Sequence, residues 1–167
     1  MGIGLNIFLN KKILIYGLGK SGLSAFEFLK NKNNVLLYDD FNKIIKGINI
    51  KKNLISYKNI LKTEFDQIIL SPGIDINKCK LSKFLKKNNK KIYTDLDVFY
   101  SFYKNNCITI TGTNGKSTTC QLLYEVLFKQ KFNVKLVGNI GNPILSSKNI
   151  KKKNNFCYRS FFLSIGI

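Results

Sequence analysis

A short glycine-rich stretch, TGTNGKSTT at residues 111–119, combines one lysine with several hydroxyl side chains. Backbone amides of such a loop can surround a phosphate, while Lys116 neutralises terminal phosphate charge and the Ser117 hydroxyl can ligate Mg²⁺. Only two residues separate Gly112 from Gly115, whereas a Walker A loop has four residues between its first glycine and its Gly-Lys pair. The pattern therefore predicts a compact phosphate-binding loop.

A second glycine-rich stretch, GLGKSG at residues 17–22, fits the pattern G-x-G-x-x-G between an apolar run and a helical pattern. Its glycines allow a tight turn and close approach to a phosphate, whose charge is met by amides at the helix start. Asp39 stands where dinucleotide-binding folds place a ribose-binding carboxylate. Taken alone, the stretch leaves open an NAD-binding oxidoreductase module, a flavin site, or glycines that serve only helix packing.

Short apolar runs alternate with helical patterns through the first hundred residues. Strands are predicted at Lys12–Tyr16, Val35–Tyr38, Gln67–Leu70 and Ile92–Thr94. Helices are predicted at Ser21–Lys30, Leu81–Lys87 and Leu96–Tyr103, the last of them capped by Asp95. Because the joins are short and strands alternate with helices, the sheet should be parallel.

After a polar break at residues 104–106, the pattern begins again. A strand at Cys107–Thr111 leads into the glycine loop and a helix at Lys116–Gln130. We place a domain boundary here, between domains 1–105 and 106–167. The predicted fold class is α/β: a Rossmann-like parallel-sheet N-terminal domain, followed by the truncated start of a P-loop-type α/β ATPase domain.

The chain is strongly basic, with 28 Lys and Arg against 9 Asp and Glu and a formal net charge of +19. Such a charge can indicate a nucleic-acid or anionic-membrane partner. The lysines, however, are spread along the chain among Asn and Ile, as AT-rich coding sequences produce, and are not clustered. We expect no nucleic-acid partner; the alternative, a nucleic-acid-binding protein, requires tight and salt-sensitive binding.

The cysteine and histidine content argues against a zinc site. The four cysteines form no C-x-x-C pair, and the chain has no histidine. Unpaired cysteines are typical of a reducing compartment, so we expect a cytoplasmic protein. The apolar run near the amino terminus is too short to span a bilayer, and we expect no membrane insertion.

Four motifs together resemble the Mur ligase family. They are GLGKSG, SPGI at 71–74, GTNGKST at 112–118 after ITIT, and VGNIGNP at 137–143. Their order and separation are most similar to the branch that adds D-glutamate to UDP-N-acetylmuramoyl-L-alanine in peptidoglycan synthesis. The resemblance extends to about Phe156. Folate-polyglutamate ligases share a similar ATP loop, but the preceding Rossmann-like domain disfavours them.

The resemblance implies an ATP-dependent ligase that needs Mg²⁺ and no NAD. ATP phosphorylates the alanyl carboxylate, and the amine of D-glutamate attacks the acyl phosphate. Family members are usually monomeric. Lys116 is implied as the catalytic residue and Ser117 as the metal ligand, within an ATP site made of Gly112, Thr113, Asn114, Gly115, Lys116, Ser117 and Thr118. The implied UDP-substrate site contains Lys20, Ser21, Asp40, Phe41, Ser71, Pro72, Gly73 and Asn139.

Two departures from the family pattern follow. Asp40 and Phe41 stand where Thr and Arg are common, and the tail FCYRSFFLSIGI matches none of the family's motifs. Removing one T from a possible coding sequence of this tail gives FVIEASSFQLE, which is close to the expected continuation. We therefore expect a frameshift near Cys157, loss of the magnesium-binding Glu and of the glutamate-binding domain, and an inactive chain.

Overall fold

The chain forms two parallel β-sheets of four and three strands. The structure, a computed structural model, describes residues 6–41, 50–103, 107–110, 113–138, 143–146 and 155–159. We call the described residues up to 103 the first unit and those from 107 onward the second unit. Among the described residues, no helix is long and apolar enough to cross a membrane.

The first unit is built on the four-stranded sheet, in the order β2-β1-β3-β4. Its strands are β1 (Lys12–Tyr16), β2 (Asn34–Tyr38), β3 (Gln67–Leu70) and β4 (Ile92–Tyr93). Its helices are α1 (Lys20–Leu29), α2 (Tyr57–Lys62), α3 (Ser82–Lys87) and α4 (Asp95–Phe102), with short 3₁₀ helices η1 (Lys51–Asn53) and η2 (Asn89–Lys91).

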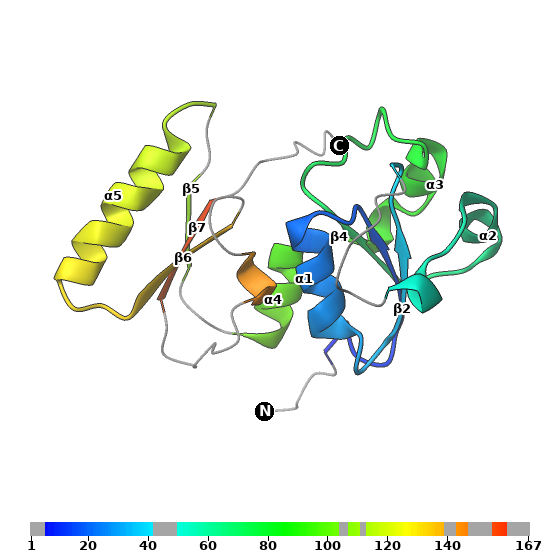
Figure 1. Cartoon of the computed structure of the whole chain (residues 1–167), viewed down its shortest axis with the longest axis horizontal. Coiled ribbons are helices and arrows are strands. Elements are labelled where there is room, and N and C mark those ends of the chain that lie inside the picture. Colours follow the sequence, from blue (N-terminus) through cyan, green and yellow to red (C-terminus); the bar gives the residue numbers. More distant parts are fainter. Residues whose placement is uncertain are drawn as a thin grey trace.

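The second unit contains the three-stranded sheet, in the order β5-β7-β6. Its elements are β5 (Cys107–Ile110), α5 (Lys116–Lys129), β6 (Val134–Gly138), the 3₁₀ helix η3 (Ile144–Ser146) and β7 (Asn155–Arg159). Figure 1 shows the two sheets side by side along the long axis, with α1, α4 and η3 between them. The middle strand, β7, lies in the tail that matched none of the expected motifs.

Both faces of the first sheet are covered, which explains the unbroken apolar runs of its central strands. Ile13 and Ile15 pack on the face toward α1 and α4, while Leu14 and Tyr16 pack on the face toward α2 and α3. Successive side chains of a strand point to opposite faces, so a strand buried on both sides is apolar throughout. All four residues of β3 are buried for the same reason.

The predicted parallel α/β architecture is confirmed, and β1 and β3 have the predicted bounds. The predicted cap of α4 is wrong. Asp95 is the first helical residue, and Thr94 is the N-cap: its hydroxyl accepts from the Asp97 backbone, and the Asp97 carboxylate accepts from the Thr94 backbone. The elements α2, β6, β7 and the three 3₁₀ helices were not predicted. The predicted break at 104–106 lies outside the described residues.

A buried tyrosine ties the end of β1 to the residue two positions after β2. The Tyr16 hydroxyl donates to Asp40 Oδ2 at 2.7 Å, and Lys80 Nζ donates to the Asp40 backbone carbonyl at 3.0 Å. The Tyr16 side chain is fully buried. Burial first, and the hydrogen bond to Asp40 second, raise the pKa of the Tyr16 phenol above its ordinary value of 10.0.

This raised pKa predicts a loss of stability at alkaline pH. Above about pH 10 the phenol ionises in the unfolded chain but keeps its proton in the folded one, so stability falls as pH rises; below that pH the stabilisation is complete. The decline from one such group is about 1.4 kcal/mol per pH unit. Tyr16→Phe should reduce the slope of unfolding free energy against pH, measured by urea denaturation between pH 8 and 11. Tyr57→Phe, which removes the hydroxyl of a residue that is 43% exposed, is the control. Equal slopes in both variants would contradict the assignment.

Candidate functional site

The first glycine loop joins β1 to α1 and is held by the ends of both neighbouring strands. Ser71, after β3, donates from its hydroxyl to the Gly17 carbonyl at 2.7 Å. Asp39, after β2, accepts from the Leu18 amide at 2.7 Å and, through its other oxygen, from the Phe41 amide at 2.9 Å. The loop is therefore fixed on both sides before any ligand arrives.

The three glycines of this loop have different steric surroundings. Gly17 has a φ of +96°, and a Cβ on it would stand 2.7 Å from the Ser71 Cβ. A Cβ on Gly22 would stand 1.9 Å from the Gly17 carbonyl oxygen, so this glycine lets α1 pack directly on the loop. A Cβ on Gly19 would meet no atom within 4 Å. Gly19 thus presents open backbone that a ligand can approach.

A cavity of about 290 Å³ opens over this loop. It lies at the carboxyl ends of parallel strands, where open α/β sheets bind ligands. Phe41, on its rim, is 78% exposed. The lining residues come from the loop, the ends of the neighbouring strands and one proline of the second unit: Gly17, Gly19, Lys20, Ser21, Asp39, Phe41, Ser71, Pro72, Gly73, Ile74 and Pro143.

Most of the predicted UDP-site residues meet at this cavity: Lys20, Ser21, Phe41, Ser71, Pro72 and Gly73. Asp40 is not among its lining residues, because its carboxylate accepts from Tyr16 and its backbone carbonyl from Lys80. Asn139 lies outside the described residues. Ser71 is engaged with the Gly17 carbonyl, so it also shapes the wall.

Asp39, not Asp40, is the acidic residue that lines the cavity. Both of its carboxylate oxygens accept backbone amides, from Leu18 and Phe41. These two bonds use about half of the lone-pair sites of the carboxylate. This geometry favours Asp39 as a residue that holds the loop. Its position after the second strand is the available sequence signal, and dinucleotide-binding folds place a ribose-binding carboxylate at that position.

The second glycine loop stands at the start of α5. Gly115 has a φ of +75°, and Thr113, Asn114 and Gly115 are exposed. Lys116 is buried, and its Nζ donates to the Thr113 carbonyl at 2.9 Å, across the loop. The first amides of the helix and the positive end of its dipole favour an anion at this terminus. Gly112 lies outside the described residues.

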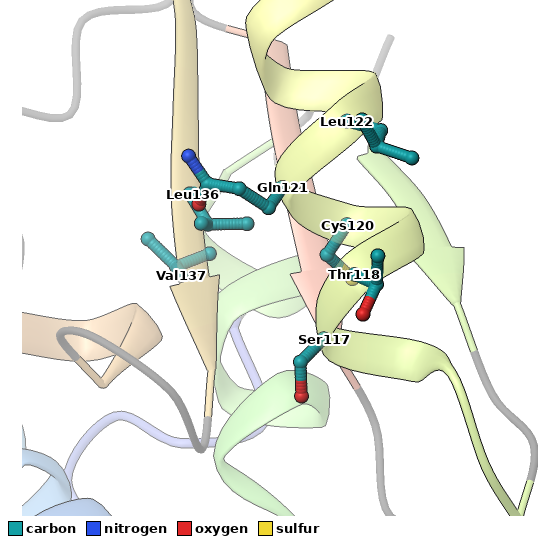
Figure 2. A pocket seen from close by; sticks show the side chains of 7 residues that line it. All are labelled: Ser117, Thr118, Cys120, Gln121, Leu122, Leu136 and Val137. Atoms are coloured by element: carbon teal, nitrogen blue, oxygen red, sulfur yellow. The ribbon is translucent and has the colours of Figure 1, made fainter.

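A second cavity, of about 380 Å³, lies beside this helix start. Figure 2 shows that its lining comes from α5, with Ser117 and Thr118 in the first turn, and from β6, with Leu136 and Val137. The described residues contain no group of three or more His, Cys, Asp or Glu that could hold a metal. A single hydroxyl, that of Ser117, fits Mg²⁺ only if phosphate oxygens and water complete the coordination.

Comparison with known proteins gives two adjacent family matches. Residues 11–93 match the Mur ligase MurD-like, N-terminal domain, and residues 110–160 match the Mur ligase middle domain. The second match continues past Phe156, where the motif resemblance ended, and includes β7.

Several curated proteins named UDP-N-acetylmuramoylalanine--D-glutamate ligase are similar to the chain. The protein from Rickettsia prowazekii (strain Madrid E) is 38% identical over 148 residues, which are 86% of this chain and 33% of the relative. The protein from Buchnera aphidicola subsp. Schizaphis graminum (strain Sg) is 40% identical over 150 residues, 86% of this chain and 34% of the relative.

The chain thus spans about one third of the length of these relatives. The two matched domains follow each other in the order that the motifs predicted, and each contains one of the glycine loops. The chain belongs to the Mur ligase family, with a MurD-like N-terminal domain followed by the start of the middle domain.

Proposed function

We propose that this protein acts in the ATP-dependent addition of D-glutamate to UDP-N-acetylmuramoyl-L-alanine through an acyl phosphate. The observation that carries the proposal is the cavity over the first loop, where open backbone at Gly19 lies beside Lys20 and Ser21. Relatives that share both domains are named as ligases of this reaction. The substrates are cytoplasmic nucleotides, so the proposal places the protein in the cytoplasm.

In the first cavity, the chain's own groups suit a uridine diphosphate. The open backbone at Gly19, the first amides of α1 and the Lys20 ammonium offer donors and positive charge to the diphosphate. Phe41, exposed on the rim, offers an aromatic face to the uracil. Asp40 supports that rim indirectly through Tyr16, and Asn139 remains a proposed contact of the muramoyl part.

At the second loop, the chain's groups suit the triphosphate of ATP. The proposed phosphate-binding loop runs from Gly112 to Thr118. When ATP binds, the Lys116 ammonium leaves the Thr113 carbonyl and pairs with the terminal phosphates. Its ammonium then neutralises charge as the phosphoryl group moves to the alanyl carboxylate. Mg²⁺, when bound at Ser117, would supply further neutralisation of phosphate charge.

For the 167 residues themselves, we propose nucleotide binding without ligation. We also propose the unit boundary at residue 105 and the frameshifted tail from about Cys157. A nicotinamide-binding module is the second candidate, because the loop has the G-x-G-x-x-G pattern. The match of both domains to the Mur ligase family favours the uridine nucleotide over it.

The glycines of the first loop provide a matched pair of variants. Gly19→Ala places a methyl group where no atom stands within 4 Å, so the melting temperature should change little while affinity for UDP-N-acetylmuramoyl-L-alanine falls about tenfold or more. Gly22→Ala forces a Cβ against the Gly17 carbonyl and should destabilise the fold by about 1–3 kcal/mol or more. For each variant, calorimetric titration measures the affinity and thermal unfolding measures the stability. Binding of NADH but not of the uridine nucleotide would reject the proposal.

The second loop is tested with Lys116→Ala. Loss of a charge-assisted hydrogen bond should weaken ATP binding about 10- to 100-fold, because such bonds contribute about 1.5–3 kcal/mol. Affinity for the uridine nucleotide should remain within about twofold, since Lys116 does not line the first cavity. Lys129→Ala, in the last turn of α5, is the control. Unchanged ATP affinity in Lys116→Ala would remove this residue from the site.

A further inference from the structure

The short helix η3 belongs to the second unit by sequence but is buried in the core of the first. Ile144 is 0% exposed and Leu145 is 5% exposed. Both lie in one apolar cluster with Phe26 and Leu29 of α1 and Phe99 of α4. Figure 1 places η3 next to α1 and α4, between the two sheets.

This contact buries three apolar side chains of the second unit. Among the side chains described there, at 108–110, 113–137 and 143–146, the buried apolar ones are Cys120, Val134, Val137, Ile144 and Leu145, and the last three belong to the first unit's cluster. By contrast, α5 exposes large apolar side chains: Leu122, Val126 and Phe128 are 59%, 51% and 62% exposed. Burial of η3 and of the end of β6 against the first unit therefore helps to position the second unit.

The same segment reaches the first cavity. Pro143 directly precedes η3 and lines the cavity with Gly17, Gly19 and Lys20. The Ser146 amide and hydroxyl both donate to the Pro143 carbonyl, at 3.0 and 2.7 Å. These two bonds close one turn, so the buried pair and the proline move as one body.

We propose that residues 143–146 make the first cavity a composite site. Ile144 and Leu145 anchor the second unit on α1 and α4, and this anchor holds Pro143 as a wall against the bound nucleotide. Pro143 touches the ligand, whereas Ile144 and Leu145 are positioning residues. The identity of the ligand rests on the proposed function, but the anchor does not.

A composite wall has an energetic consequence for the second sheet. A ligand that contacts Pro143 binds the docked state better than the undocked one, and it shifts the equilibrium by that difference. β6 ends at Gly138, shortly before Pro143, and Val137 lies in the shared cluster. Ligand in the first cavity should therefore slow local opening of β6, although β6 belongs to the other sheet.

The test compares two alanine variants of the full chain. Ile144→Ala removes the anchor, and Val134→Ala removes a buried β6 side chain outside the shared cluster. With UDP-N-acetylmuramoyl-L-alanine as the probe, Kd should rise about tenfold or more in Ile144→Ala and less than about threefold in Val134→Ala. Hydrogen exchange should show the ligand slowing β6 amides in Val134→Ala but not in Ile144→Ala, while β1 amides stay protected in both.

The proposal is overturned if both variants keep the affinity and the ligand-dependent protection of β6. If Ile144→Ala does not fold, Leu145→Val gives a milder loss of the anchor, with the same direction expected and the same result contradicting it. If the unaltered chain binds no uridine nucleotide, the proposed function fails. Hydrogen exchange of the ligand-free variants then tests whether Ile144 anchors the second unit. Faster exchange of the α1 amides in Ile144→Ala than in Val134→Ala supports the anchor, and equal exchange rejects it.

Discussion

The carbonyl oxygen of Gly17 is the point on which the first site is built. Ser71 donates to it from the end of β3, and the absence of a side chain at Gly22 lets α1 begin against it. One residue later, Asp39 at the end of β2 accepts the Leu18 amide. The ends of three strands and the start of α1 thus meet at one turn. Within this turn, the backbone at Gly19 stays open to a ligand. A preformed loop loses little conformational entropy when it takes a phosphate.

The second loop is held differently from the first, which is tied to the ends of two neighbouring strands. A hydrogen bond runs from Lys116 Nζ to the carbonyl of Thr113, within the loop itself. The unit that carries it is placed through η3, which is buried on α1 and α4. The first loop is therefore held by contacts within the first unit, whereas the second unit packs on the first through η3. In the proposed reaction, positioning of this kind would bring the phosphoryl donor to the substrate in the first cavity.

The predictable parts of the fold were those decided by burial. The bounds of β1 and β3 followed from continuous apolar runs, because both strands are covered on two faces. The cap of α4 was missed although Thr94 and Asp97 form a capping box three residues apart. Strand β7 could not be predicted, because its place between β5 and β6 depends on pairing with distant residues. Asp39 and Asp40 are adjacent, and only the structure shows which of them faces the cavity.

The central claim is that the first loop is pinned before ligand arrives, and the Leu18 amide reports on it directly. Its hydrogen-exchange rate can be measured by NMR in the ligand-free chain at neutral pH, with an Asp39→Ala variant for comparison. We predict that the Leu18 amide is protected to a degree similar to the amides of β1, and that Asp39→Ala abolishes this protection while β1 stays protected. Exchange of Leu18 at the rate of an exposed loop amide in the unaltered chain would contradict the account.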